Sequence, residues 1–190
     1  MTKTINRKIL NFLCFMVFFV AAFNFLALPR TIYDIGLEYG WSGIQKGNLL
    51  SVSAVGFIFS AVVSGYLSEF FGKKQVLIFG IMFSFLGNAA FGFLPKFGLK
   101  NPFHFFLFFN FLIGAGNGIL ESLTNALVIH LNEEKSSLYL NLAHAFFALG
   151  AVVAPLVGGW ILLISGWQMI FQLNAAVSFA LLISLSLIHI

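Results

Sequence analysis

The chain has 190 residues, of which 60% are hydrophobic and only 8% are charged. Because soluble domains are about 25% charged, this composition excludes an ordinary soluble enzyme, a disordered tail and a nucleic-acid-binding domain. Ten Lys and Arg against six Asp and Glu give a net charge of +4, which on so apolar a chain indicates membrane orientation rather than a nucleic-acid partner.

Six apolar segments follow one another along the chain, each near the length of about 20 residues that a membrane-spanning helix requires. The predicted spans are roughly Ile9–Pro29, Gly47–Ser68, Val76–Pro95, Phe103–His130, Leu138–Ile164 and Gln168–Ile190. Their length and their Leu, Phe and Ala content favour helices over barrel strands, which alternate over about ten residues. The sequence predicts an all-α membrane protein with a single six-helix bundle over residues 1–190, three helices in 1–95 and three in 96–190.

A basic start precedes the first segment, as it does in signal peptides. The apolar run here exceeds the signal core of roughly 7–15 residues, so we expect it to remain as a membrane helix. Six spans place both termini on one side, together with Lys3, Arg7, Lys8, Lys73, Lys74 and Lys135. The other side holds Arg30, Lys46, Lys96 and Lys100. The positive-inside rule therefore predicts cytoplasmic termini in a plasma (inner) membrane.

Three glycines recur at a constant distance of 94 residues. Those around the second segment and its exit loop correspond to those around the fifth: Gly56, Gly65 and Gly72 to Gly150, Gly159 and Gly166. An offset of three helices reverses the orientation across the membrane. The recurrence predicts a 3+3 inverted repeat, the internal design of one half of many secondary transporters.

The loop between the second and third segments, residues 65–74, reads GYLSEFFGKK. It resembles the signature loop of the major facilitator superfamily, with Glu69 in place of the usual Asp and Phe70 in place of Arg. In that family the loop locks the cytoplasmic side of the outward-facing state. The resemblance implies a gating loop made of Gly65, Glu69, Gly72, Lys73 and Lys74. Alternatively, the two lysines are only topology anchors.

Two later stretches resemble the same superfamily. Residues 150–159, GAVVAPLVGG, are similar to its fifth-helix pattern of small residues, a proline and a glycine pair. Gly166-Trp167-Gln168 is similar to the turn before its sixth helix. The first stretch also indicates a bend and a small-residue surface for close helix packing.

The fourth and fifth segments resemble the fucose:proton symporter branch. Residues 114–125, GAGNGILESLTN, carry Glu121 and Asn125 four positions apart, and residues 140–146, LNLAHAF, begin with Leu-Asn-Leu. The resemblance implies the N-terminal half of a twelve-helix fold. It also implies a role for Glu121 in handling protons and a sugar.

Glu121 is the only acidic residue inside a predicted span. On a helix of about 100° per residue, its side is shared by Asn110, Gly114, Asn117, Thr124, Asn125 and Val128. The opposite side is apolar and is expected to be lipid-like: Phe105, Phe109, Leu112, Ile119, Leu123 and Leu127. Because polar groups facing lipid are costly, the stripe around Glu121 is predicted to face the bundle interior or a wet cavity.

The rise per residue places Glu121 about 14 Å and His144 about 9 Å from the cytoplasmic ends of their helices. We predict that these two groups meet, directly or through water, and that Glu121 takes up and releases a proton under the influence of His144. A protonated Glu121 that bridges helices, or one that binds solute hydroxyls, is an alternative. The candidate solute- and proton-binding residues are Asn24, Asn117, Glu121, Asn125, Asn141 and His144.

Other polar positions are predicted to serve packing. Small residues at every fourth position let membrane helices approach closely, as in Ser53, Gly56, Ser60 and Ser64, and again in Gly80, Ser84, Asn88 and Gly92. Gln172 either lines a cavity or bridges helices. The remaining histidines, His104, His130 and His189, lie near span ends and are expected at the membrane interface.

An enzyme is the weakest interpretation. Residues 40–43, Gly-Trp-Ser-Gly, match the Gly-x-Ser-Gly string of rhomboid-type intramembrane serine proteases, and His189 lies in the sixth span. Ser42, however, is expected in a polar loop with no buried base beside it. The only cysteine, Cys14, excludes an intrachain disulfide and a cysteine-based zinc site, and we expect neither a metal nor a cofactor.

We therefore predict transport of a small polar solute by proton- or sodium-coupled symport and alternating access, with a sugar as the first choice from the resemblance. The expected partners are the solute, the ion and the lipid bilayer, without nucleic acid. Since the family's site lies between two halves, the chain needs either a missing C-terminal six-helix half, of which it is a fragment, or a second copy. A non-transporting receptor or assembly subunit is the alternative.

Overall fold

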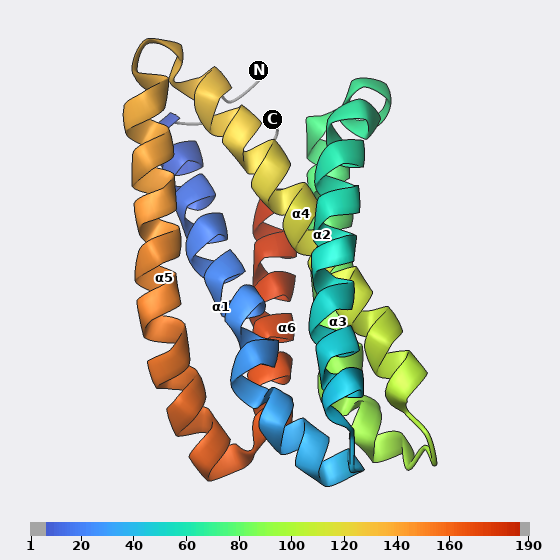
Figure 1. The fold of residues 1–190 in the computed structure, drawn as a ribbon. Helices are drawn as coiled ribbons and strands as arrows, with labels where there is room; N and C mark the ends of the chain where they lie inside the picture. The colour runs from blue at the N-terminus through green and yellow to red at the C-terminus, as the bar shows by residue number, and fades with distance from the viewer. Residues whose placement is uncertain (1–6, 187–190) are drawn as a thin grey trace.

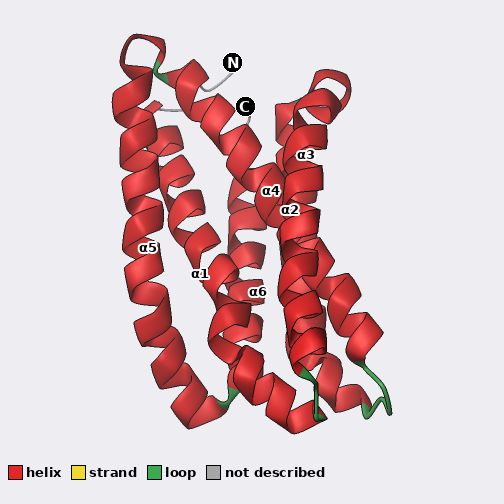
Figure 2. Ribbon diagram, viewed as in Figure 1, coloured by secondary structure: helices red, strands yellow, loops and turns green. Residues whose placement is uncertain are grey.

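The computed structural model describes residues 7–186, and within this range helices are joined by short turns with no β-strand (Figure 2). The helices are α1 (Arg7–Tyr39), α2 (Gly43–Phe71), α3 (Lys73–Phe93), α4 (Phe103–Leu131), α5 (Ser136–Ser165) and α6 (Trp167–Ser186), with 3₁₀ turns η1 (Leu94–Phe97) and η2 (Glu133–Lys135). Each of α1 to α6 is long and apolar enough to cross a membrane. This confirms the predicted all-α fold with six spans. Lys3 and His189 lie outside the described residues.

Helix α1 is longer than predicted, since it continues past Pro29 to Tyr39. Proline removes one backbone donor, but in membrane helices nearby hydroxyl groups can bond the carbonyls around it. Here the buried Thr31 hydroxyl donates to the carbonyl of Ala27 at 2.8 Å. This bond does not replace the donor that Pro29 lacks, because the carbonyl left without it is that of Phe25. Helix α1 nevertheless continues to Tyr39, beyond the end of the apolar run.

Helices α2 and α5 end in the same way. Gly72 has a φ of +82° and Gly166 has a φ of +79°, values that favour glycine. The N–H of Gly72 donates to the Ser68 carbonyl at 3.1 Å, and the N–H of Gly166 donates to the Leu162 carbonyl at 3.2 Å. Both the glycines and their acceptors are 94 residues apart, so the repeat found in the sequence recurs in the turns.

Helix pairing follows the same symmetry. Helix α2 packs mainly on α4, α1 mainly on α5, and α3 on both α4 and α6 (Figure 1). A Cβ atom at Gly56 would clash with the Phe111 carbonyl of α4, and one at Gly150 would lie 2.5 Å from the Phe19 carbonyl of α1. Each glycine thus permits a backbone contact that a side chain would prevent.

The axis of this pseudo-symmetry runs between α3 and α6. The hydroxyl oxygens of Ser84 and Ser178 lie 3.4 Å apart, and these two serines are themselves separated by 94 residues. Two positions related by a two-fold axis can touch each other only beside that axis. The serine pair therefore marks the centre of the 3+3 inverted architecture.

The end of the bundle away from both termini is filled by aromatic side chains. Phe91 and Phe106 are fully buried with ring centroids 4.6 Å apart. Around them lie Trp41, Phe103, Trp167 and Phe171. The indole N–H of Trp167 donates to the Glu38 carboxylate at 2.6 Å. These contacts join α1, α3, α4 and α6 at one end, where aromatic residues also suit a membrane interface.

The predicted lipid-like side of α4 is wrong in its central part. Ile119, Leu123 and Leu127 are all buried. The first two pack in a cluster with α3, and Leu127 packs with Cys14 of α1. Helix α4 crosses the bundle between other helices, so its apolar side is covered by protein there. Phe105, nearer the helix start, is exposed as expected.

The small-residue stripe of α3 packs as predicted. A Cβ atom at Gly80 would lie 2.7 Å from the side chain of Ile119, and one at Gly92 would lie 2.9 Å from Gln172. The amide of Gln172 donates to the carbonyl of Gly92 at 3.1 Å. Gln172 therefore bridges α6 and α3.

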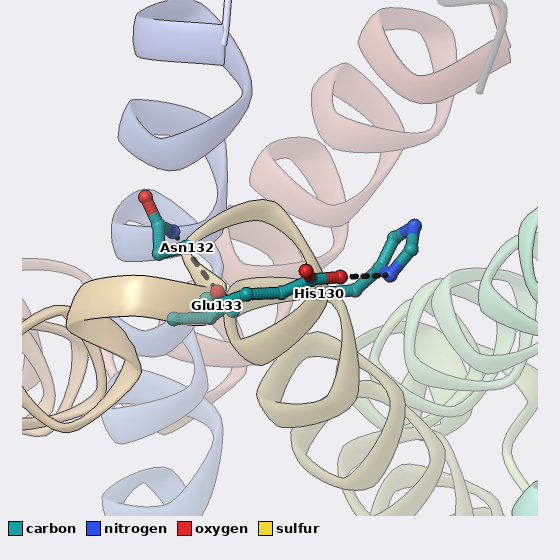
Figure 3. A network of polar contacts seen from close by, with 4 residues as sticks. His130, Asn132 and Glu133 are labelled. Atoms are coloured by element: carbon teal, nitrogen blue, oxygen red, sulfur yellow. Dashed lines mark hydrogen bonds and ion pairs between the residues drawn. The ribbon is translucent and has the colours of Figure 1, made fainter.

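At the opposite end of the bundle, where α1 begins and α6 ends, polar side chains hold the chain together. Asn11 of α1 and Asn132 exchange two amide hydrogen bonds of 3.0 and 2.7 Å, and both residues are buried. Next to them, the His130 ring and the Glu133 carboxylate lie 3.5 Å apart (Figure 3). Both side chains are mostly exposed, as expected for a histidine at the membrane interface.

Candidate functional site

Three polar side chains occupy successive turns on one side of α4. Asn117 is buried, and Glu121 and Asn125 are half-buried. The side-chain oxygens of Asn117 and Asn125 are inaccessible to solvent and accept no hydrogen bond from the described residues. A buried acceptor without a donor is costly. The Asn88 side-chain oxygen of α3 is in the same state, so what distinguishes Asn117 and Asn125 is their position on either side of Glu121.

Glu121 lies between two supporting helices. One turn towards the helix start, Gly118 meets the Phe57 carbonyl of α2 so closely that a Cβ atom would clash. Two turns towards the helix end, Val128 packs with Cys14 of α1. The carboxyl is therefore held over the line between α1 and α2, partly open and partly covered. It forms no hydrogen bond or ion pair within residues 7–186.

The structure places Asn141 and His144 on the exposed side of α5. The ring of His144 lies against that of Phe18 of α1, with centroids 5.1 Å apart. No direct bond joins His144 to Glu121 in the described part of the chain. The two predicted partners are therefore not joined, and α5 packs mainly on α1 and only lightly on α4.

Asn24 lies between α1 and α3 and not beside the polar stripe of α4. It is buried and donates to the Ser84 hydroxyl at 3.1 Å, while it accepts from the Asn88 amide at 3.1 Å. These partners lie on α3, close to the pseudo-symmetry axis marked by Ser84 and Ser178. Asn24 therefore links α1 to α3 inside the bundle, apart from the stripe on α4.

Other members of the polar side of α4 also bond neighbouring helices. The buried Asn110 amide donates to the Leu49 carbonyl of α2 at 2.7 Å. A Cβ atom at Gly114 would overlap the Ser53 carbonyl of the same helix. The stripe is thus divided: its first part joins α4 to α2, and the part from Asn117 to Asn125 keeps free acceptors.

An aromatic group that sequence reasoning did not single out borders this stripe. Phe25 of α1 has its ring 5.4 Å from that of Phe57 of α2 and 6.1 Å from that of Phe147 of α5. Phe57 is the same residue whose carbonyl meets Gly118, so the group lies about one turn from Glu121. It brings three helices together beside the candidate site.

The predicted gating loop, residues 65–74, is mostly helical: it comprises the last two turns of α2, a turn at Gly72 and the start of α3. Gly72 provides its positive φ, and Lys74 donates to the Ser186 carbonyl at 3.2 Å, where a cation suits a helix C-terminus. Glu69 and Lys73 are exposed, and nothing lies within 4 Å of a Cβ atom placed at Gly65. The structure accounts for Gly72 and Lys74, whereas the gating role of the loop stays a prediction.

Ser42 has a structural role. Its hydroxyl accepts from the Gln45 N–H at 3.3 Å and the Gln45 side chain accepts from the Ser42 N–H at 2.9 Å, which is a capping box at the start of α2. The Gly-x-Ser-Gly string of residues 40–43 thus begins a helix. His189, its suggested base, lies outside the described residues.

Sequence reasoning also missed Arg30, which it counted only as an orientation charge. The Arg30 side chain lies over the glycine pair of α5, with Nη2 3.2 Å from a Cβ atom placed at Gly159. Both features are visible in the sequence: a cation directly after the first span, and a glycine pair in the fifth span. Nothing in the sequence connects them, because their contact depends on how α1 crosses α5.

Comparison with curated proteins gives consistent transporter relatives. The chain is 25% identical over 87% of its length to the probable anion transporter 1, chloroplastic, of Oryza sativa subsp. japonica, covering 31% of that protein. It is 25% identical over 86% of its length to the cis,cis-muconate transport protein of Acinetobacter baylyi, covering 38% of it. The chain thus spans about a third of the length of these relatives, which are transporters and not enzymes. The resemblance to the fucose:proton symporter branch stays a prediction.

Solved structures share the fold. A proton:xylose symporter superposes with a TM-score of 0.76 at 14% identity, over 94% of this chain and 44% of that one. A peptide transporter superposes with a TM-score of 0.77 at 19% identity, over 93% of this chain and 37% of that one. The family model of the Major Facilitator Superfamily matches residues 12–189. With its six membrane-length helices and its loop of residues 65–74, the chain belongs to the major facilitator superfamily.

Proposed function

We propose that this chain forms one half of a secondary transporter that moves a small neutral, hydroxyl-rich solute, a sugar as first choice, by proton-coupled alternating access. The observation that carries the proposal is the half-buried Glu121 between two asparagines whose side-chain oxygens lack donors. An ionisable group inside a membrane bundle is costly to keep and usually marks a solute or ion path. Alternating access then rocks two bundles around a site near the midplane.

The solute class follows from the charges around the stripe. Asn117, Glu121 and Asn125 of α4 present acceptors, and Asn141 and His144 are exposed on α5. No lysine or arginine belongs to this set. Hydroxyl groups supply the donors that unpaired amide oxygens need, and the rings of Phe25, Phe57 and Phe147 offer apolar faces beside them. An anionic solute would lack a cationic partner here, apart from a protonated histidine.

Proton coupling is assigned to Glu121. Rocking between two openings would expose the Glu121 carboxyl first to one side of the membrane and then to the other, so that it takes up a proton on one side and releases it on the other. His144 lies against Phe18 of α1 and forms no bond with Glu121 within residues 7–186, so any influence on Glu121 would act through water or through closure of the site.

The test is solute uptake into proteoliposomes that contain the whole carrier. A panel of radiolabelled monosaccharides, with a dicarboxylate for comparison, is offered with and without an inward proton gradient. Glu121→Gln keeps the shape of the side chain but cannot release a proton. We expect this variant to keep exchange of the sugar and to lose the part of accumulation that the gradient drives.

Glu133→Gln is the matched control, since Glu133 is exposed and touches only His130 at the surface. It should accumulate the sugar as the unmodified protein does. Equal gradient-driven accumulation in Glu121→Gln and the unmodified protein would end the coupling proposal. Uptake of none of these solutes, with the protein correctly folded, would favour a non-transporting membrane subunit.

The other half of the site must come from outside this six-helix unit. Helices α2 and α5 are the least buried of the six, and they flank the stripe on α4. We infer that a second six-helix half, or a second copy of this chain, covers them in the working carrier. A plasma-membrane location with cytoplasmic termini is part of the same proposal and is supported by the cations at the end where α1 begins.

A further inference from the structure

An elongated cavity of about 290 Å³ lies between α1, α5 and α6. Its walls are almost entirely aliphatic or aromatic, and include Phe19, Phe23 and Ala27 of α1 and Ala154 of α5. An apolar cavity of this kind does not hold ordered water. In a membrane, the occupant that suits such a lining is an apolar one, such as an acyl chain.

This cavity is separate from the solute stripe. On α1, Phe25 faces α2 and α5 through its ring contacts, whereas Phe23 lines the cavity. Two residues on a helix differ by about 200°, so these side chains leave nearly opposite sides of α1. An occupant of the cavity thus neither enters nor blocks the site around Glu121.

One end of the cavity carries a single cation. Arg30 lines it, and its guanidinium rests above the glycine pair of α5, where a Cβ atom at Gly159 would lie 3.2 Å from Nη2. Within residues 7–186 the Arg30 side chain has no hydrogen bond or ion pair, not even with Asp34 one turn along the helix. Arg30 is exposed, so its five N–H donors are accessible to an anion at the mouth of the cavity.

The dimensions match a membrane amphiphile. From Phe19 to Arg30 is eleven residues, or about 16 Å along α1. Arg30 follows directly on the apolar run that ends at Pro29, so it lies where lipid headgroups meet the hydrocarbon. The cavity continues from there towards the middle of the bilayer, parallel to a lipid chain.

We propose that this cavity is a binding site for an anionic phospholipid of the surrounding bilayer. One acyl chain lies between α1, α5 and α6, and Arg30 binds the phosphate. Gly158 and Gly159 keep the space above α5 open so that the guanidinium can lie there. The site gives these two glycines a role beyond the close packing expected for small residues in membrane helices.

Photolabelling tests this proposal. The whole carrier is placed in nanodiscs that contain phosphatidylglycerol and phosphatidylcholine in equal amounts, and in parallel samples one or the other carries a diazirine in its acyl chain. We expect phosphatidylglycerol to label the peptides of α1, α5 and α6 around the cavity roughly fivefold more than phosphatidylcholine, because one cation beside the phosphate favours a headgroup of net negative charge over a zwitterionic headgroup with the same phosphate.

Three variants separate the parts of the site. Arg30→Gln should reduce phosphatidylglycerol labelling to the level of phosphatidylcholine. Lys96→Gln, which removes an exposed cation at the same end of the bundle, should leave the preference intact. Ala154→Leu fills the cavity and should lower labelling by both lipids. Thermal unfolding of each variant confirms that the fold is kept.

Equal labelling by the two lipids in the unmodified protein would overturn the proposal. So would an unchanged phosphatidylglycerol preference in a folded Arg30→Gln variant. Labelling that is lost in Ala154→Leu, together with a preference that disappears only when Arg30 is replaced, supports both the acyl-chain and the phosphate assignments.

Discussion

Residues of the same type serve opposite purposes in this bundle, and their neighbours decide which. The side-chain amides of Asn24 and Asn110 donate hydrogen bonds to neighbouring helices. The side-chain oxygens of Asn117 and Asn125, in contrast, accept no hydrogen bond within the described residues. Glycines divide in the same way. A Cβ atom at Gly114 would overlap the Ser53 backbone, but one at Gly65 would meet nothing.

The glycine contrast gives a direct prediction at this scale. Gly114→Ala forces a methyl group into the backbone of α2, which cannot move without displacing the whole helix. We expect the free energy of unfolding in detergent to fall by about 1–3 kcal/mol. Chemical or thermal unfolding followed by circular dichroism measures it.

Gly65→Ala is the matched control, since the added methyl group has open space and alanine favours the helix over glycine. Its stability should equal or slightly exceed that of the unmodified protein. A Gly114→Ala variant as stable as Gly65→Ala would contradict the close approach of α4 and α2.

Among the elements, the two exit turns show most clearly what the inverted repeat does. Gly72 and Gly166 end α2 and α5 with nearly equal positive φ values and equivalent hydrogen bonds. The turn at Gly72 also holds the loop that resembles the family's gating loop. The backbone geometry of this turn is therefore explained by the repeat alone. A gating function would be an additional property of the turn at Gly72.

We predict that Gly72→Ala and Gly166→Ala destabilise the protein by similar amounts, about 1–3 kcal/mol each, because alanine is strained at these dihedral angles. Gly43→Ala, at an open position near the start of α2, should change stability little. The unfolding midpoints of the three variants measure these differences in stability. Only Gly72→Ala is expected also to slow transport, so equal transport rates in Gly72→Ala and Gly166→Ala would count against a gating role.

For the whole molecule, the distribution of burial indicates how the bundle is completed. Helices α3 and α4 are the most covered within the six-helix unit, and α2 and α5 are the least. A bundle that leaves one little-covered helix on each side of a polar stripe suits assembly with a second bundle. The chain also spans about a third of the length of its curated relatives.

We therefore expect the 190-residue chain, expressed by itself, to associate with a second copy. Native mass spectrometry in mild detergent should show two chains in one particle, and cysteine cross-links should form between the exposed sides of α2 and α5. When a C-terminal six-helix half is supplied on the same chain, the particle should contain one chain. A monomeric six-helix unit that still accumulates solute would contradict the two-bundle proposal.

Much of the fold follows from composition and spacing. Apolar runs of about 20 residues in a chain with so few charges indicate membrane helices. The glycines that recur 94 residues apart predicted the inverted repeat. Span ends were less predictable, because helix α1 continues through Pro29 to Tyr39, ten residues beyond the predicted end of the span. The presence of Glu121 as the one acid within a predicted span was likewise readable from the sequence.

The sequence by itself determined that the chain crosses a membrane six times, that its halves are related by inversion and that α4 carries a polar stripe. Only the tertiary structure decided that Asn24 joins α3, that Ile119, Leu123 and Leu127 are covered, and that Arg30 meets the glycines of α5. The physical reason is that helical periodicity sets the direction of a side chain relative to its own helix. Which neighbour lies in that direction depends on how the helices cross.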